Sequence, residues 1–280
     1  MTLIKTPSHA DWNACKRTKL LRNGERISYV EAGSSDGIPL VLLHGFGNSS
    51  RNWKGCFARL ESGYHIYAVD EMGVGAGSCP DRFVFTIIEQ AERVVELMDL
   101  LGVERFCLAG HSIGSYIAQA ISFARPNRVM AAVLVSSFAY LPESGDDVIR
   151  SEKFYGEQGR RPDEHWYSER GSYPDAEGLE YQLEELKSLP QGYFRATWWG
   201  MTMADHRGFL ALIKAPVLLI WGSADEGIPE EARQVLRNAL PAARVLTYEG
   251  LGHEIVSRAP ERLSIDIKEF LDKCVSACRR

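Results

Sequence analysis

Short apolar runs alternate along the chain with longer segments in which apolar residues recur every three or four positions. The short runs cover residues 39–43, 64–69, 106–109, 129–135 and 216–221, with a weaker run at 244–248. Runs that are apolar at every position are typical of strands buried inside a parallel sheet. The helical segments cover residues 87–101, 113–124, 230–239 and 260–274. This alternation predicts the α/β fold class, a mostly parallel, doubly wound sheet with helices on both sides.

Two stretches depart from the alternation. At the start, residues 19–21 and 27–31 read as two strands around an Asn23-Gly24 turn, and residues 32–38 read as a loop. From 138 to 207 there is no strand-like run, and the helices expected there cover residues 146–157, 165–170, 177–189 and 193–203. Long insertions in compact domains are usually functional. We therefore expect a core formed by residues 1–137 and 208–280, with a helical cap at 138–207 inserted between two core strands.

Composition limits the partners. Of the 280 residues, 45% are hydrophobic and 25% charged, and the net charge of −5 gives no basic footprint for nucleic acid. No window approaches the ~20 apolar residues of a membrane span. The first residues lack the apolar core of a secretory signal, so a cytoplasmic location is expected. Nothing marks a dimer face, which leaves a monomer or a homodimer. The spacing of cysteines and histidines gives no metal motif, and no cofactor is expected.

The segment most informative about chemistry is Gly110-His111-Ser112-Ile113-Gly114, which lies between a predicted strand and a predicted helix. G-x-S-x-G in that context forms a sharp turn that exposes the serine hydroxyl, with glycines where side chains would collide. The N-terminus of the following helix points free N–H groups at charge that develops near the serine. Ser112 is therefore the candidate nucleophile.

A nucleophilic serine needs a base, and the base needs a group that orients it. Asp225 follows the predicted strand at 216–221, and His253 follows the one at 244–248. Because the carboxyl ends of parallel strands meet at one edge of the sheet, these side chains are expected close to Ser112. The alternative acid is the neighbouring Glu226.

A glycine-rich turn, His44-Gly45-Phe46-Gly47, follows the first core strand. Such a turn aims a backbone N–H at the same oxyanion, so the N–H groups of Phe46 and Ile113 are the candidate oxyanion hole. For the His44 ring we favour a structural bond to the turn over a catalytic role, because His253 is better placed.

These motifs, with Asp70-Glu71-Met72-Gly73 and Trp221-Gly222-Ser223-Ala224-Asp225, occur in the order found in the α/β-hydrolase superfamily, which the chain resembles from about residue 20 to 271. The resemblance is to lidded members, which include esterases, lactonases and carbon–carbon bond hydrolases. It implies a catalytic triad of Ser112, His253 and Asp225, and a structural role for Asp70. Serine at the nucleophile position argues against haloalkane dehalogenases and epoxide hydrolases, which use aspartate. Glu71 and Glu254 are unusual, and Glu254 is expected to point to solvent.

The sequence thus predicts a serine hydrolase that cleaves an ester or lactone of a small, moderately apolar substrate. Candidate pocket residues are His44, Phe138, Trp198, Trp199 and Met203. The first alternative is carbon–carbon bond hydrolysis, in which Arg195, Arg207 or His206 would meet a substrate carboxylate. The second is a small-molecule receptor that keeps the triad but turns over slowly.

Overall fold

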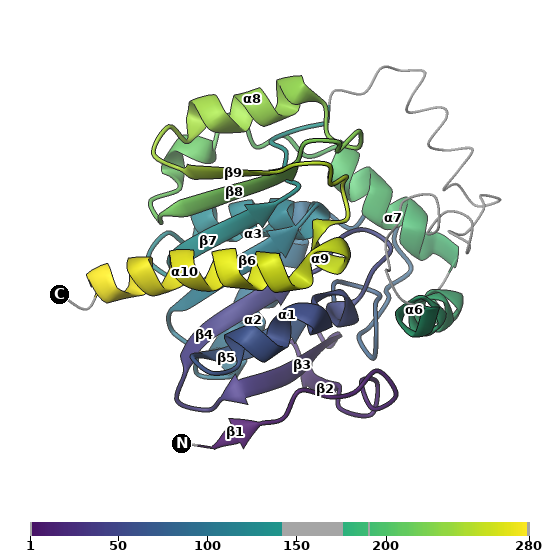
Figure 1. The fold of residues 1–280 in the computed structure, drawn as a ribbon. Helices are drawn as coiled ribbons and strands as arrows, with labels where there is room; N and C mark the ends of the chain where they lie inside the picture. The colour runs from purple at the N-terminus through teal and green to yellow at the C-terminus, as the bar shows by residue number, and fades with distance from the viewer. Residues whose placement is uncertain (1, 142–175, 190, 279–280) are drawn as a thin grey trace.

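A single sheet organises the computed structural model, which describes residues 2–141, 176–189 and 191–278. Within those residues the sheet has nine strands in the order β1-β3-β5-β4-β6-β7-β8-β9, with β2 on the outer side of β3 (Figure 1). The strands are β1 (Leu3–Ile4), β2 (Arg17–Leu20), β3 (Arg26–Ser34), β4 (Ile38–Leu43), β5 (Tyr64–Val69), β6 (Phe106–His111), β7 (Val129–Val135), β8 (Val217–Gly222) and β9 (Arg244–Tyr248). The predicted strands are confirmed to within two residues at each end, except that β3 runs three residues beyond its predicted end.

Neighbouring strands from β5 to β9 pair in parallel, whereas β1, β2 and β3 are antiparallel to their neighbours. The predicted hairpin is present as β2 and β3, and its turn places Gly24 at φ +84°. The loop expected at residues 32–38 is wrong in its first part. β3 continues to Ser34 because it bonds on both sides, with Gly33 opposite both Ile4 and His65.

Two helical layers cover the sheet. α2 (Ile87–Leu100), α3 (Ile113–Ala124) and α8 (Glu230–Ala239) lie on one face, and α1 (Lys54–Leu60), α9 (Ile255–Arg258) and α10 (Pro260–Cys278) on the other (Figure 1). Alternate residues of β4 divide between the layers: Val41 and Leu43 pack under α2 and α3, and Leu40 and Leu42 under α1 and α10. This is the doubly wound core expected from strands that are apolar at every position.

Helices α6 (Ala176–Ser188) and α7 (Gln191–Thr202) lie in the insertion between β7 and β8, close to the positions predicted. Helix α7 packs on the loop before α2, where the Phe85 N–H donates to the Ala196 carbonyl at 2.9 Å. The predicted helices at 146–157 and 165–170 lie outside the described residues. Throughout the described ranges, no helix combines the length and the apolar character that crossing a membrane requires.

The short elements are those that the sequence pattern missed. They are α1, α9, β1 and two 3₁₀ turns, η1 (Ser50–Trp53) and η2 (Leu210–Leu212). One or two turns offer too few apolar repeats to define a helical face. Of these elements, η1 matters for the site because it follows the glycine-rich turn after β4.

Candidate active site

Ser112 lies between the end of β6 and the start of α3 in a backbone conformation that is unfavourable for a residue with a side chain. Its φ is 52° and its ψ is −119°. The turn closes because Gly110 and Gly114 lack side chains: a Cβ on Gly110 would lie 2.3 Å from the Gly114 carbonyl oxygen, and one on Gly114 would lie 2.4 Å from two carbonyl oxygens at the end of β4. A strained, sharply turned serine at the head of a helix is the arrangement expected of a nucleophile, although Ser112 is only 7% exposed and not open to solvent as the sequence predicts.

The predicted base and acid lie beside Ser112. The His253 Nε2 atom is 2.9 Å from the Ser112 Oγ, and the His253 Nδ1 atom is 3.1 Å from both carboxylate oxygens of Asp225. Because the carboxylate only accepts, Nδ1 carries the proton, and Nε2 accepts from the serine hydroxyl. The three side chains therefore form one directed chain of hydrogen bonds at the carboxyl ends of β6, β8 and β9.

Asp225 is held as an anion. Burial opposes its charge, but the bond to His253, the nearby Arg233 and the Gly227 N–H together hold the pKa of this carboxyl below its ordinary value. The Arg233 guanidinium also donates to the Asp225 carbonyl, which fixes the loop after β8. Glu226, the alternative acid, is exposed and makes none of the described contacts with His253. The structure thus brings Asp225 to the histidine.

Two further residues hold the backbone of His253, and the sequence analysis missed both. His111 Nε2 donates to the His253 carbonyl at 3.0 Å, and Ser136 Oγ donates to the same oxygen at 2.8 Å. Ser136 has φ 48°, so both serines with positive φ stand at the ends of adjacent strands, β6 and β7. Burial lowers the pKa of His111, which keeps the ring neutral and its Nε2–H available as a donor. No sequence spacing links residues 111 and 136 to 253.

The turn after β4 lies directly against the serine. A Cβ on Gly45 would come within 3.5 Å of the Ser112 Cβ. The His44 ring is fully buried and accepts from the Glu71 N–H at 3.0 Å through Nε2, while its Nδ1–H donates to the Gly45 carbonyl. Burial lowers the pKa of His44 to about 4, so the ring is neutral. His44 thus braces the turn, as favoured from the sequence.

Helix α7 places aromatic rings on the same turn. The Phe46 ring contacts Phe194 and Trp198 in edge-on geometry, each with its centroid 5.9 Å away. Trp199 stacks on Phe83, and Phe138 is buried against Tyr116. Met203 is 69% exposed, which does not fit the predicted place in an enclosed pocket. Of the predicted pocket residues, Trp198 is the one that reaches the candidate oxyanion turn from the insertion.

The three side chains proposed for a substrate carboxylate all lie against aromatic rings. The Arg195 guanidinium lies over the Phe83 ring, with its Cζ 5.0 Å from the ring centroid. Arg207 pairs with Asp205 at 2.6 Å and covers the Tyr140 ring. His206 is buried between Tyr116 and Phe123, and burial lowers its pKa to about 3, so it is neutral. Arg207 and His206 support the packing of the segment after α7.

Two carboxylates near the site are buried. Glu254, which the sequence placed toward solvent, is only 5% exposed, because the chain enters α9 directly after it and turns that residue inward. Glu71 is also enclosed, with its Oε1 4.0 Å from the His44 Nδ1. Burial, and then the neighbouring Asp70, raise the pKa of Glu71 well above its ordinary value. This environment therefore favours the protonated, neutral form of Glu71.

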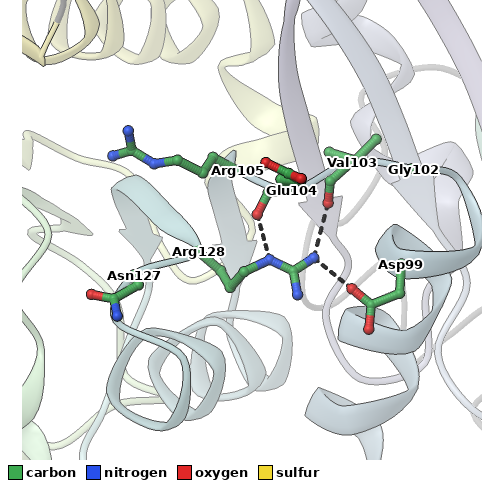
Figure 2. Close-up of a pocket in the computed structure, with 7 residues that line it drawn as sticks. All are labelled: Asp99, Gly102, Val103, Glu104, Arg105, Asn127 and Arg128. Carbon is green, nitrogen blue, oxygen red and sulfur yellow. Dashed lines mark hydrogen bonds and ion pairs between the residues drawn. The ribbon is translucent and has the colours of Figure 1, made fainter.

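A surface hollow elsewhere on the molecule is separate from this site. It lies before β6, at the end of that strand remote from Ser112 (Figure 2). Its central side chain, Arg128, donates to the carbonyls of Val103 and Glu104 and pairs with Asp99 at 2.7 Å. The guanidinium there closes the loop around Gly102.

The mostly parallel sheet with helices on both faces is consistent with the α/β-hydrolase fold. Residues 40–264 match the Alpha/beta hydrolase family. The chain belongs to that family.

Individual relatives are similar over most of the chain. Lipase 1 of Psychrobacter immobilis is 26% identical over 267 residues, which span 89% of this chain and 82% of the lipase. The solved structure of a bacterial membrane phospholipase A has a TM-score of 0.79 at 27% identity, covering 92% of this chain and 86% of that one. The enol-lactonase from Burkholderia xenovorans LB400 has a TM-score of 0.78 at 19% identity, covering 91% and 100%. The enol-lactonase shares the fold.

Proposed function

We propose that the protein is a serine hydrolase that cleaves a carboxylic ester or lactone of a small, moderately apolar substrate. The observation that carries the proposal is the chain of hydrogen bonds from Ser112 through His253 to Asp225, at a strained turn on the head of a helix. Intact geometry of this kind has no structural purpose that a simpler turn would not serve. The similarity to Lipase 1 and to phospholipase A agrees with ester cleavage.

The proposed reaction has two halves. The Ser112 Oγ attacks the substrate carbonyl while His253 Nε2 takes the proton of the Ser112 hydroxyl. Asp225 stabilises the imidazolium that forms on His253. The protonated His253 then gives its proton to the leaving alcohol oxygen, which leaves an acyl-enzyme. Water, deprotonated by His253, repeats the attack and releases the acid with Ser112 regenerated.

The oxyanion would rest on two backbone N–H groups. Ile113 is the first residue of α3, where N–H groups have no acceptor within the helix. Phe46 lies one residue beyond Gly45, which faces the Ser112 Cβ. Aromatic rings of Phe46, Phe194 and Trp198 would give an apolar wall for the acyl or aryl part of the substrate. In this proposal α6 and α7 belong to a cap over that wall.

The test is steady-state hydrolysis of p-nitrophenyl esters of increasing acyl length, and of simple lactones, by wild type and Ser112→Ala. We expect many turnovers per second for the wild type, and a loss of about 10⁴-fold or more in Ser112→Ala. Ser62→Ala, an exposed serine after α1, is the matched control and should behave as wild type. The acyl-length optimum would give the size of the pocket.

Other outcomes would redirect the assignment. Turnover that survives in Ser112→Ala would refute the serine mechanism. With no turnover of any ester or lactone, cleavage of vinylogous diketones would establish carbon–carbon bond hydrolysis. A few events per hour, together with ligand-dependent binding of a partner, would establish a receptor.

A further inference from the structure

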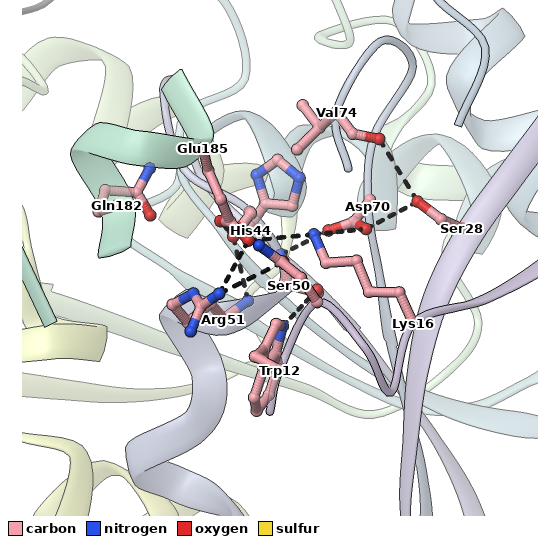
Figure 3. A network of polar contacts seen from close by, with 12 residues as sticks. Trp12, Lys16, Ser28, His44, Ser50, Arg51, Asp70, Val74, Gln182 and Glu185 are labelled. Carbon is pink, nitrogen blue, oxygen red and sulfur yellow. Dashed lines mark hydrogen bonds and ion pairs between the residues drawn. The ribbon is translucent and has the colours of Figure 1, made fainter. Parts of the chain in front are cut away.

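Four charged side chains form a buried cluster beside the turn that follows β4. Lys16 Nζ lies 3.1 Å from Asp70 Oδ2 and 3.2 Å from Glu185 Oε1, and Arg51 Nη2 lies 3.2 Å from the same Glu185 oxygen (Figure 3). The side chains are between 0% and 8% exposed. We refer to Lys16, Arg51, Asp70 and Glu185 as the ionic cluster.

The charges of the ionic cluster balance, with two cations and two anions. Burial alone would raise the pKa of Asp70, but Lys16, the Ser50 N–H and the Ser28 hydroxyl hold it below its ordinary value. Burial opposes the charge on Lys16, yet Asp70 and Glu185 raise its pKa. A buried ion that loses its partner is strongly destabilising, so each member depends on the others.

The ionic cluster joins segments that are remote along the chain. Lys16 precedes β2, Arg51 lies in η1, Asp70 follows β5, and Glu185 comes from the inner face of α6. Figure 3 shows the Glu185 side chain extending from α6 toward the charged ends of Lys16 and Arg51. The cluster is therefore one of the places at which the inserted helix α6 is fixed to the core.

Helix α6 also forms hydrogen bonds with the turn after β4, which contains the candidate oxyanion donor Phe46. Gln182 Nε2 donates to the Gly47 carbonyl at 2.7 Å, and the Ser49 hydroxyl donates to Glu185. Gln182 and Glu185 are three positions apart, so they project from one face of the helix. Gly47 is the residue after Phe46. The inserted helix is thus bonded to the residue that follows Phe46 and to Ser49, two residues farther on.

The N-terminal segment completes this anchorage. Trp12 Nε1 donates to the Ser50 hydroxyl at 3.1 Å, and the Arg51 guanidinium donates to the His9 carbonyl. The same guanidinium stacks over Tyr181 of α6, with its Cζ 4.9 Å from the ring centroid. The N-terminal segment thus packs against the η1 side of the ionic cluster, through Trp12 and His9.

We propose that Glu185 and Gln182 are positioning residues for the oxyanion hole, so that the seating of α6 on the core sets the geometry of the Phe46 N–H. This inference rests on the proposed function. Removing an oxyanion donor reduces kcat about 100–1000-fold, and a displacement of 1 Å can cost about 100-fold. Because α6 holds Gly47 and Ser49 by two hydrogen bonds, its position should affect kcat as well as the conformation of the turn.

The experiment compares Glu185→Gln with Glu184→Gln, the same change at the adjacent, exposed position of α6. Assays run at least 20 °C below the melting temperature of each variant. For Glu185→Gln we expect kcat on the best ester to fall about 10-fold or more, with KM within about twofold. The inhibition constant of a trifluoromethyl ketone, which forms an oxyanion on Ser112, should rise by the same factor as kcat falls. Glu184→Gln should match wild type in all three quantities.

Hydrogen–deuterium exchange supplies a readout that is independent of turnover. Faster exchange of residues 45–52 in Glu185→Gln than in Glu184→Gln would show that α6 holds the turn, even if the wild type cleaved no ester and the proposed function failed. If esters are cleaved but kcat, inhibitor binding and exchange are the same in both variants, the positioning role is overturned and the proposed function stands. A loss of melting temperature with kcat unchanged would also overturn it.

If Glu185→Gln does not fold, Gln182→Met tests the proposal instead. Methionine is similar in size to glutamine and equally uncharged, but it lacks the amide N–H that donates to the Gly47 carbonyl. We expect kcat to fall about 3–10-fold, with KM within about twofold and the exchange of residues 45–52 increased. Gln182→Met at wild-type kcat would contradict control by α6.

Discussion

The strand-end residues around Ser112 and the ionic cluster are both polar and both largely buried, but they are satisfied in different ways. Ser112, His253 and Asp225 form a single line of hydrogen bonds, which ends on a hydroxyl whose oxygen keeps a lone pair for attack. In the ionic cluster Glu185 alone meets two cations and a hydroxyl. The line of bonds from Ser112 to Asp225 starts at a strained residue that is the candidate nucleophile. The ionic cluster instead joins segments that are remote along the chain. Mutations in the two should therefore separate rate from stability.

Asp225→Asn should have the largest effect, and on rate. An amide cannot hold the His253 tautomer with a proton on Nδ1, and loss of that orientation lowers kcat by about 10⁴-fold in serine triads. Steady-state ester hydrolysis measures the change, and the melting temperature should move by only a few degrees. Glu226→Gln, next in sequence and exposed, should keep wild-type kcat. Equal losses in the two variants would show that the triad acid is misassigned.

Lys16→Met should show the opposite behaviour. It leaves Asp70 and Glu185 without their shared cation, and breaking a buried pair costs about 3–5 kcal/mol. The free energy of unfolding from urea titration should fall by about 3 kcal/mol, because Asp70 keeps its bonds to Ser28 and Ser50. Lys5→Met, in the same N-terminal segment but exposed, should change it by less than about 0.5 kcal/mol. A small loss in Lys16→Met would mean that the cluster is hydrated.

Backbone strain at Ser112 gives a third separation. Glycine tolerates φ 52°, whereas alanine does not, so Ser112→Gly should be about 1–2 kcal/mol more stable than Ser112→Ala although both are inactive. Ser62 lies outside the left-handed region, and there the glycine variant should be no more stable than the alanine variant. Thermal and urea unfolding measure both pairs. If the glycine variant were more stable than the alanine variant by the same amount at both positions, the backbone at Ser112 would not be strained.

The smallest expected effect concerns acid. His206 has its pKa lowered to about 3 by burial, although Asp205 opposes this. Between that value and the ~6.5 of an unfolded chain, the unfolded state binds the extra proton, so stability falls as pH drops below about 6.5. His206→Asn should lessen the loss between pH 6 and pH 5 by about 1 kcal/mol. Urea titrations at several pH values test this, and parallel curves for variant and wild type would contradict it.

The two regions also differ in how much of them can be predicted from sequence. Ser112, Asp225 and His253 follow strands that are recognisable as apolar runs, and parallel strands end at a common edge. Local patterns were therefore enough to bring together residues up to 141 positions apart. Lys16 and Glu185 follow no such rule. The contact between Lys16 and Glu185 depends on how α6 packs on the core, which local sequence patterns do not determine. A single lysine or glutamate in a sequence is normally expected on the surface.

Burial explains the remaining errors. Glu254 was placed toward solvent because glutamate is usually exposed, yet the chain turns into α9 immediately after it. Met203 is predicted to line the pocket because apolar residues of the insertion are expected at the boundary between cap and core, yet it comes one residue after the end of α7 and is exposed. In both cases the end of a helix, which is the least predictable feature of a sequence pattern, decided where the side chain points.

The order of the strands has a consequence during synthesis. Ser112 and His253 are 141 residues apart, and ribosomes add about 5–20 residues per second, so the serine is translated about 7–28 seconds before the histidine. During that interval the nascent chain holds a serine with no base beside it. On the proposed mechanism, a product that ends before β9 would therefore lack its base, and reactivity would be acquired only after His253 has been translated.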